Sequence, residues 1–137
     1  MMTRAIYWFL SSRPYKRKTV MYKSHAIRAE VADGFLKQMI GLMYREGIGS
    51  DEGMLFPLIF SGKSAASIIM FNMKFSIDIV WLDKSRRVVD IVRNAKPEKS
   101  MFFGKSYAPK RHSSYVLELK SGTVGRLGMG IGDELKF

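Results

Sequence analysis

The sequence contains no cysteine. This absence excludes disulfide bonds, thiolate zinc sites and a cysteine nucleophile, and it gives no sign of an oxidising compartment. Histidine is also scarce, because His25 and His112 are the only two in the chain. A metal site needs several converging ligands, and these two offer no paired spacing. We therefore expect no metal and no cofactor, and the catalytic residues, if there are any, stay unknown.

Long hydrophobic runs are missing as well. The apolar run near the start, residues 5–10, has six residues. Such a run is too short for the core of a signal peptide and far too short to span a bilayer. We expect no transmembrane segment, and a protein that is cytoplasmic or peripheral to the membrane.

Acidic residues are few, with 12 Asp and Glu against 23 Lys and Arg, which gives a net charge of +11. Residues 1–23 hold six basic and no acidic side chains, and residues 84–111 hold nine basic and two acidic ones, a net +7. Positive charge concentrated in this way attracts phosphate-bearing polymers or anionic lipid head groups. Simple solubility is the alternative reason for such a charge.

What the sequence does contain is a strong hairpin pattern. At 137 residues and 47% apolar, the chain suits one domain with a real core. Two runs of branched and aromatic residues, 77–82 and 88–92, flank a polar turn at residues 83–86. This arrangement is typical of an antiparallel hairpin, and a run apolar on nearly both faces belongs in the middle of a sheet.

Other segments complete a β-rich domain. Strands are predicted at residues 19–22, 25–31, 53–56, 66–71, 115–119 and 134–137, and Tyr115, Leu117 and Leu119 are expected to point inward. Asp33 is expected to cap a helix that ends near residue 43, with Gly41 allowing close packing on a strand. The predicted fold is α+β, a small, mainly antiparallel barrel or strongly curved sheet with one main helix at about residues 33–43. We predict a basic N-terminal tail, residues 1–18, and a single β-rich domain, residues 19–137.

Several ordered motifs resemble a known family. They stand at residues 32–33, 41–45, 51–56, 78–83, 115–118 and 131–133. Together they are similar to the uncharacterised prokaryotic domain-of-unknown-function family one hundred and ninety-two. The resemblance implies a small β-rich, barrel-like fold with one main helix, and it brings no established activity, cofactor or catalytic residue. The family's aromatic-Met-Lys-Asn-Thr run reads Ile-Met-Phe-Asn-Met here, at residues 69–73, which weakens any polar site that this run forms in relatives.

Asp78 stands out because it opens the most apolar predicted strand. A buried carboxylate must be hydrogen-bonded or paired. One interpretation is a structural lock that accepts bonds from backbone N–H groups or from Arg45. The other is a ligand-binding carboxylate in the mouth of the barrel. We predict that Asp78 and Asn72 share a polar pocket, with Arg45 and Glu52 as further candidates; Glu52 could instead pair with Arg45 or bind a cation.

The long segment 94–111 is the second candidate site. Its basic side chains are Lys96, Lys99, Lys105, Lys110 and Arg111, and Phe102, Phe103 and Tyr107 lie among them. Cations interleaved with aromatic rings suit nucleic acid or an anionic membrane surface. The alternative is that the two phenylalanines pin the loop to the core. We predict weak, salt-sensitive binding of polyanions at this loop.

Two functions from different classes follow from these features. The first is a non-enzymatic binding or accessory module with a basic surface loop, whose protein partners are unknown. The second is an enzyme that acts on a small polar substrate with Asp78 as its base. The absence of a cysteine nucleophile and of a histidine pair favours the first.

Overall fold

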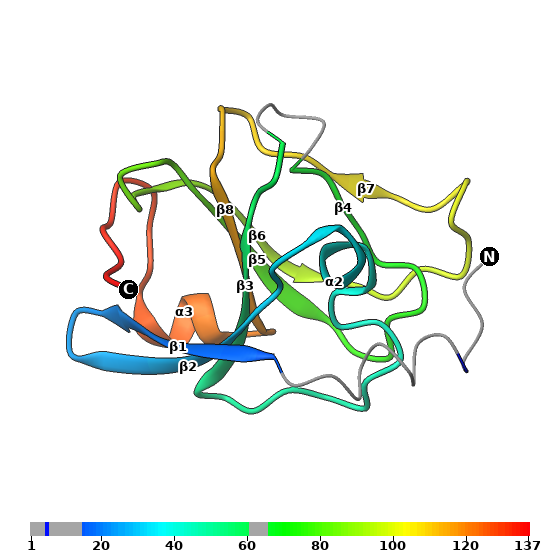
Figure 1. Ribbon diagram of the computed structural model, residues 1–137, viewed down its shortest axis with the longest axis horizontal. Coiled ribbons are helices and arrows are strands. Elements are labelled where there is room, and N and C mark those ends of the chain that lie inside the picture. Colours follow the sequence, from blue (N-terminus) through cyan, green and yellow to red (C-terminus); the bar gives the residue numbers. More distant parts are fainter. Residues whose placement is uncertain (1–4, 6–14, 61–65) are drawn as a thin grey trace.

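One six-stranded sheet forms the centre of the computed structural model, which describes residues 5, 15–60 and 66–137 (Figure 1). The strand order is β1 (Lys16–Tyr22), β2 (His25–Val31), β3 (Glu52–Pro57), β8 (Tyr115–Lys120), β5 (Ile77–Leu82), β6 (Val88–Ala95). β2 and β3 pair in parallel, and every other neighbouring pair is antiparallel. The α+β class is therefore confirmed, with a curled mixed sheet in place of the closed barrel that was one of the two predicted forms.

The central hairpin is confirmed. β5 is buried along its whole length and lies between β8 and β6. The turn that joins β5 to β6 is held by Asp83, whose Oδ1 accepts bonds from the backbone N–H groups of Ser85, at 2.8 Å, and Arg87, at 3.0 Å. A strand covered on both faces needs apolar residues at every position, which explains why this stretch carries the clearest pattern in the sequence.

The curl of the sheet gives it two cores, one on each face. Val80 and Leu117 belong to the first core, which the short helix α3 (Thr123–Leu127) covers. Ile79 and Val116 belong to the second core, which also contains Leu42 and Met70. Alternate residues of β5 and β8 therefore enter different cores, and neither face of these strands is left to solvent.

The helix α2 (Phe35–Ile40) is shorter than predicted. Asp33 is not its cap, because the N-cap residue is Gly34 and no side chain bonds there; the Asp33 carboxylate instead accepts a bond from the Lys37 ammonium at 3.1 Å. Gly41, with φ 51°, ends the helix, and its position 3.4 Å from the Phe56 ring (measured from an ideal Cβ) confirms the predicted close packing. Within the described ranges, no helix has the length and apolar character needed to cross a bilayer.

The first strand begins earlier than predicted. β1 starts at Lys16, so residues 16–18 of the predicted tail pair with β2. Tyr15 also packs on the second core, with the Lys37 ammonium 4.8 Å from the centre of its ring. Apart from residue 5, the rest of the predicted tail lies outside the described residues.

The basic segment 94–111 is partly regular. β6 extends to Ala95, and β7 (Ser106–Tyr107) pairs with β4 (Ile68–Ile69) as a small second sheet. The strand predicted at 66–71 is thus reduced to two residues. In Figure 1 this small sheet lies beside α2 on the side of the molecule away from α3.

Residues 132–136 connect the two edges of the large sheet. Lys136 exchanges two backbone hydrogen bonds with Met21 of β1, at 2.8 and 3.0 Å. Within the same segment, the Leu135 N–H donates to Arg86 at 3.0 Å, and Asp133 accepts from the Val88 N–H at 2.8 Å. The predicted strand 134–137 is therefore a series of isolated bridges that fasten β1 to the start of β6.

Candidate functional site

A cavity of about 200 Å³ lies between α2 and the second core. The residues after the helix form one wall, the β4 segment forms another, and Phe56 of β3 completes the lining. Four methionines contribute to it: Met39, Met43, Met70 and Met73. Met39 and Ile69 are also exposed to solvent, so they mark the rim through which the cavity can be reached.

Glu118 lies in the wall of this cavity. It sits in the middle of β8, opposite Met54 of β3 and Ile79 of β5, and only 5% of it is exposed. Its Oε2 lies 3.9 Å from where a side chain on Gly41 would begin. A glycine at position 41 therefore leaves the carboxylate open to the cavity.

Burial controls the ionisation of Glu118. Among the described residues, none donates a hydrogen bond to its carboxylate, and desolvation raises its pKa to about 8, against a smaller lowering by the charge of Arg45. A buried acid with a raised pKa in a cavity is a recognised mark of a functional site, although structural groups can show it as well. At neutral pH this carboxyl group is mostly protonated.

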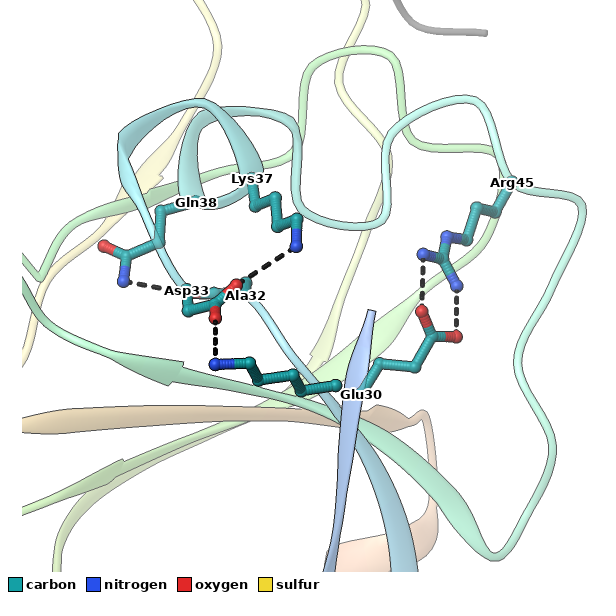
Figure 2. A network of polar contacts seen from close by, with 7 residues as sticks. Glu30, Ala32, Asp33, Lys37, Gln38 and Arg45 are labelled. Atoms are coloured by element: carbon teal, nitrogen blue, oxygen red, sulfur yellow. Dashed lines mark hydrogen bonds and ion pairs between the residues drawn. The ribbon is translucent and has the colours of Figure 1, made fainter. Parts of the chain in front are cut away.

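Arg45 forms a bidentate ion pair with Glu30 of β2, at 2.8 and 3.1 Å, as Figure 2 shows. The guanidinium hydrogen bonds hold the pKa of Glu30 below its usual value. On the other side of Figure 2, the Gln38 amide donates to the carbonyl of Ala32, and it also bonds the carbonyl of Pro57. These contacts fasten α2 and the segment after it to β2 and β3, and so they hold one wall of the cavity in place.

Asp78 is 1% exposed and faces the first core, away from the cavity. Its carboxylate accepts three backbone hydrogen bonds, from the N–H groups of Asn94 (2.9 Å), Gly122 (3.1 Å) and Val124 (2.9 Å). These contacts match the structural lock, with backbone donors in place of Arg45. The carboxylate thereby joins β5, the end of β6 and the start of α3.

The structure does not bring the four predicted pocket residues together. Asn72 donates to the hydroxyl of Tyr44 at 2.8 Å, on the side of the molecule that carries Lys74 and Lys99. Arg45 and Glu52 both line a separate small depression of about 100 Å³, and Glu52 accepts a bond from the Gly49 N–H at 2.8 Å. No group of three His, Cys, Asp or Glu side chains suited to a metal ion occurs among the residues that the structure describes.

The basic loop presents its phenylalanines to solvent. Phe102 is 84% exposed and Phe103 is 95% exposed, so they do not pin the loop to the core. The Ser100 hydroxyl accepts bonds from the backbone N–H groups of both residues, at 3.2 and 3.0 Å. A hydrogen-bonded turn thus holds two aromatic side chains outward.

The predicted anion-binding residues are all exposed, but they fall into two places. Lys96, Lys99 and Lys105 flank the phenylalanines in the sequence, and the backbone N–H of Lys105 donates to the Glu98 carboxylate at 3.3 Å. Lys110 and Arg111 lie further along, where the Lys110 N–H donates to Asp90 of β6 at 2.9 Å. The first three lysines are therefore the ones placed to act with the aromatic pair.

Glu118 is the residue that sequence reasoning missed. The alternation of Tyr115, Leu117 and Leu119 led to the expectation that the residues between them face solvent, yet both faces of β8 are buried. The available signal was Val116, an apolar residue on the same face as Glu118. A strand that is apolar on both faces except for one acid indicates a buried acid.

The curled mixed sheet, with the short helices α2 and α3, places the chain among the small α+β proteins. The DUF192 family model, described as "Uncharacterized ACR", matches residues 17–137. The chain belongs to this family, as the sequence motifs indicated.

Archaeal relatives carry the name of the uncharacterised UPF0127 family. The Thermococcus sibiricus protein is 37% identical over 110 residues, which cover 80% of this chain and 66% of that protein. The Pyrococcus furiosus protein is 32% identical, over 84% of this chain and 92% of its own length. The match covers slightly less than two thirds of the Thermococcus proteins, and none of these names carries an activity.

Two solved structures share the fold. One, from Sinorhizobium meliloti, is named a "putative transcription regulator" and superposes with a TM-score of 0.80 at 29% identity, over 90% of this chain and 95% of that one. The other, a protein of unknown function from Novosphingobium aromaticivorans, gives a TM-score of 0.75 at 29% identity, over 90% and 85% of the two chains. Neither name states a ligand.

Proposed function

We propose that the protein is a non-enzymatic accessory module that docks on anionic lipid surfaces through the turn at residues 99–105, and that it works peripherally at a membrane. The observation that carries this proposal is the pair Phe102 and Phe103, which are almost fully exposed on a hydrogen-bonded turn. Large aromatic side chains held in water are costly unless something else covers them.

Further exposed apolar side chains belong to α2 and β4. α2 contributes Phe35, Leu36 and Met39. Met39 and Ile69 line one cavity, and Ile69 of β4 pairs with Ser106 of β7, which follows directly on the turn. Met39 and Ile69 therefore place exposed apolar side chains on α2 and on β4, the strand that pairs with the residues following the turn. Surfaces of this kind mark interaction sites on soluble proteins.

The charge of the loop indicates which partner it fits. Lys96, Lys99 and Lys105 flank the phenylalanines in the sequence, and residues 84–111 carry a net +7. Aromatic side chains insert at the boundary between head groups and acyl chains while neighbouring lysines contact anionic head groups. An apolar surface with a basic border fits a lipid layer better than a nucleic acid, whose backbone calls for a continuous basic groove.

The enzyme hypothesis loses its proposed base. Asp78 is buried, its carboxylate accepts bonds from three backbone N–H groups, and it lines neither the cavity nor the small depression described above. A general base must reach the proton that it removes. This geometry supports a binding role over catalysis at Asp78.

The test is a co-sedimentation titration with vesicles of phosphatidylcholine alone and of equal parts phosphatidylcholine and phosphatidylglycerol. We expect binding to the anionic vesicles only. The double variant Phe102→Ser/Phe103→Ser should lose at least about 100-fold in affinity, because each ring forfeits roughly 1.5–3 kcal/mol of burial. The triple variant Lys96→Ala/Lys99→Ala/Lys105→Ala should lose about 100-fold at low salt, at about 1 kcal/mol per lysine.

Ile131→Ser is the matched control, because Ile131 is exposed and lies far along the chain from the turn. It should leave vesicle binding unchanged. Single-stranded and duplex oligonucleotides form the second arm, prompted by the name of the Sinorhizobium structure. Tighter binding to oligonucleotides than to anionic vesicles, or vesicle binding that survives the serine substitutions, would overturn the proposal.

A further inference from the structure

Glu118 faces a cavity, and no described residue donates a hydrogen bond to its carboxyl group. Among the described residues, no side-chain oxygen is both enclosed and unpaired, so the Glu118 oxygens, which accept no hydrogen bond, reach the open space of the cavity. Asp78, in the adjacent strand, shows how this fold satisfies a buried acid when it serves structure alone. The Glu118 carboxyl group has no such donors and lines the cavity instead. A molecule that enters the cavity can therefore supply its partner.

We propose that this cavity binds a small organic cation, an alkylammonium whose charged head pairs with the Glu118 carboxylate and whose short apolar chain lies among the methionines. The cavity opens at Met39 and Ile69, which also belong to the apolar surface proposed to dock on lipid, but Glu118 plays no part in that docking and the probes here are soluble, so the two proposals are tested independently. No covalent step is involved.

The lining fits both parts of such a ligand. Met43, Met70 and Met73 are buried and supply flexible, polarizable surface for an apolar chain. Phe56 adds an aromatic ring close to Gly41 and Glu118. A cavity of 150 Å³ is enough to hold benzene. The 200 Å³ measured here therefore has room for an ammonium head with a chain of about four carbons.

The charged groups around Glu118 favour the exchange of its proton for an ammonium ion. Glu118 is the one titratable side chain among the described residues that line the cavity. Arg45 is the charge that acts on it from the segment after α2, and Glu30 of β2 balances Arg45. On α2 itself, Lys37 is engaged by Asp33. Because the carboxyl group is protonated at neutral pH, an entering ammonium replaces a proton and the net charge of the cavity stays unchanged.

The exchange predicts a specific dependence on pH. Below the pKa of Glu118, one proton leaves for each ammonium that binds, so the affinity should rise about tenfold per pH unit and level off above pH 8. A neutral ligand of the same size displaces no proton. Its affinity should not change with pH.

The experiment is a calorimetric titration of the full chain with n-butylammonium and with 1-butanol, at pH 6, 7 and 9. The two probes have the same number of non-hydrogen atoms and differ mainly in charge. We expect n-butylammonium to bind about tenfold more tightly at pH 7 than at pH 6, while any binding of 1-butanol stays constant. The carboxyl carbon of Glu118, followed by NMR, should titrate at lower pH when n-butylammonium is saturating.

Glu118→Gln keeps the size of the side chain and removes the charge, so it should lose n-butylammonium binding by at least about tenfold and abolish its pH dependence. Glu134→Gln is the matched control, because Glu134 is an exposed acid paired with Arg87 and lies outside the cavity lining. The proposal is overturned by equal binding of n-butylammonium and 1-butanol, by preference for butyrate, by unchanged binding in Glu118→Gln, or by no binding at any pH. The probe comparison on the unmodified chain decides the question even if the variant does not fold.

Discussion

Two buried acids lie in neighbouring strands of one sheet and have opposite surroundings. Asp78 of β5 faces the first core and accepts three backbone hydrogen bonds. Glu118 of β8 faces the second core, and no described residue donates to it. Both are almost fully buried, so burial alone does not separate them. The supply of donors does, and it marks Asp78 as part of the framework and Glu118 as part of a site.

The largest effect should come from removing the satisfied acid. Asp78→Ala leaves three N–H groups without their acceptor, one of them buried (Val124) and two part-buried (Asn94 and Gly122). Because an unpaired buried group costs about 1–3 kcal/mol, we expect the free energy of unfolding to fall by about 4 kcal/mol. Urea denaturation at pH 7 measures it. Asp51→Ala, at an exposed acid, should change stability by less than about 0.5 kcal/mol. A loss below about 1 kcal/mol for Asp78→Ala would remove the contrast between the two acids.

Glu118→Gln, in contrast, should raise the free energy of unfolding. Burial raises the pKa of Glu118 from 4.5 to about 8 on folding, so its protonated form is the one that the fold favours. The contribution of this group is fully present below pH 4.5 and is lost as the pH rises to 8. Relative to the original chain, Glu118→Gln should therefore have a free energy of unfolding that is about 3 kcal/mol higher at pH 7, higher still at pH 9, and little different at pH 4.5.

Denaturation curves at intervals from pH 4.5 to 9 check this prediction. The acids with lowered pKa values, Glu30, Asp33 and Asp133, contribute below this window, because their stabilisation is lost only as the pH falls. If the two stability profiles run parallel from pH 4.5 to 9, Glu118 is not protonated in the fold.

Gly41→Ala sharpens the comparison at the mouth of the cavity. Gly41 has φ 51° and ψ −128°, a conformation that favours glycine, and a Cβ there would touch the Phe56 ring at 3.4 Å. We expect a loss of about 2 kcal/mol in thermal or urea unfolding. The added methyl group lies 3.9 Å from Glu118 Oε2, so it should also raise the titration midpoint of Glu118, followed by NMR.

Gly34→Ala separates the cost of a strained backbone from the effect of a methyl group near Glu118. Gly34 also has a positive φ, 101°, but nothing lies within 4 Å of its Cβ position. This variant should show the backbone cost without any change in the titration of Glu118. If the titration midpoint of Glu118 shifts equally in both variants, the shift does not depend on a methyl group at the mouth of the cavity.

The smallest effect concerns a third acid, which has donors but is partly exposed. Asp133 accepts a bond from the Tyr22 hydroxyl at 2.6 Å and from the Gly130 N–H at 2.8 Å, and the Tyr22 bond is the main cause of its lowered pKa. Tyr22→Phe should lower the free energy of unfolding by about 1 kcal/mol at pH 7, a modest value because solvent screens this partly exposed pair. The loss should be smaller at pH 2, because protonation of Asp133 removes the charge that the Tyr22 hydroxyl stabilises. Urea unfolding at both values checks this. An effect that is larger at pH 2 would contradict it.

The sequence predicted the parts of the fold that depend on continuous apolar runs. The hairpin of β5 and β6 and the strand β2 were found because branched residues mark a strand that is covered on one or both faces. The helix was overestimated, because Phe35, Leu36 and Met39 look like a buried stripe and are in fact exposed. Helical spacing shows which residues share a face, and it does not show what covers that face.

The site was harder to predict than the fold. Asp78 was correctly singled out as an acid in an apolar strand, but its donors come from residues 94, 122 and 124, which no local pattern connects to it. Glu118 was passed over because alternation assigns it to the outer face. Only the curl of the sheet, which gives that face its own core, shows that the acid is buried.

The fastening of both sheet edges by residues 132–136 has a consequence for the order of folding. Met21 in β1 forms its backbone hydrogen bonds with Lys136, and the carbonyl of Arg86 accepts its bond from Leu135. Neither edge of the sheet therefore has these hydrogen bonds until residues 135 and 136 have been synthesised. Contacts so distant in sequence form late and slow the folding rate. During translation, β1 and β6 are unprotected edges that can pair with other chains. The appearance of residues 132–136 thus completes the sheet and also ends the period in which these two edges are open to other chains.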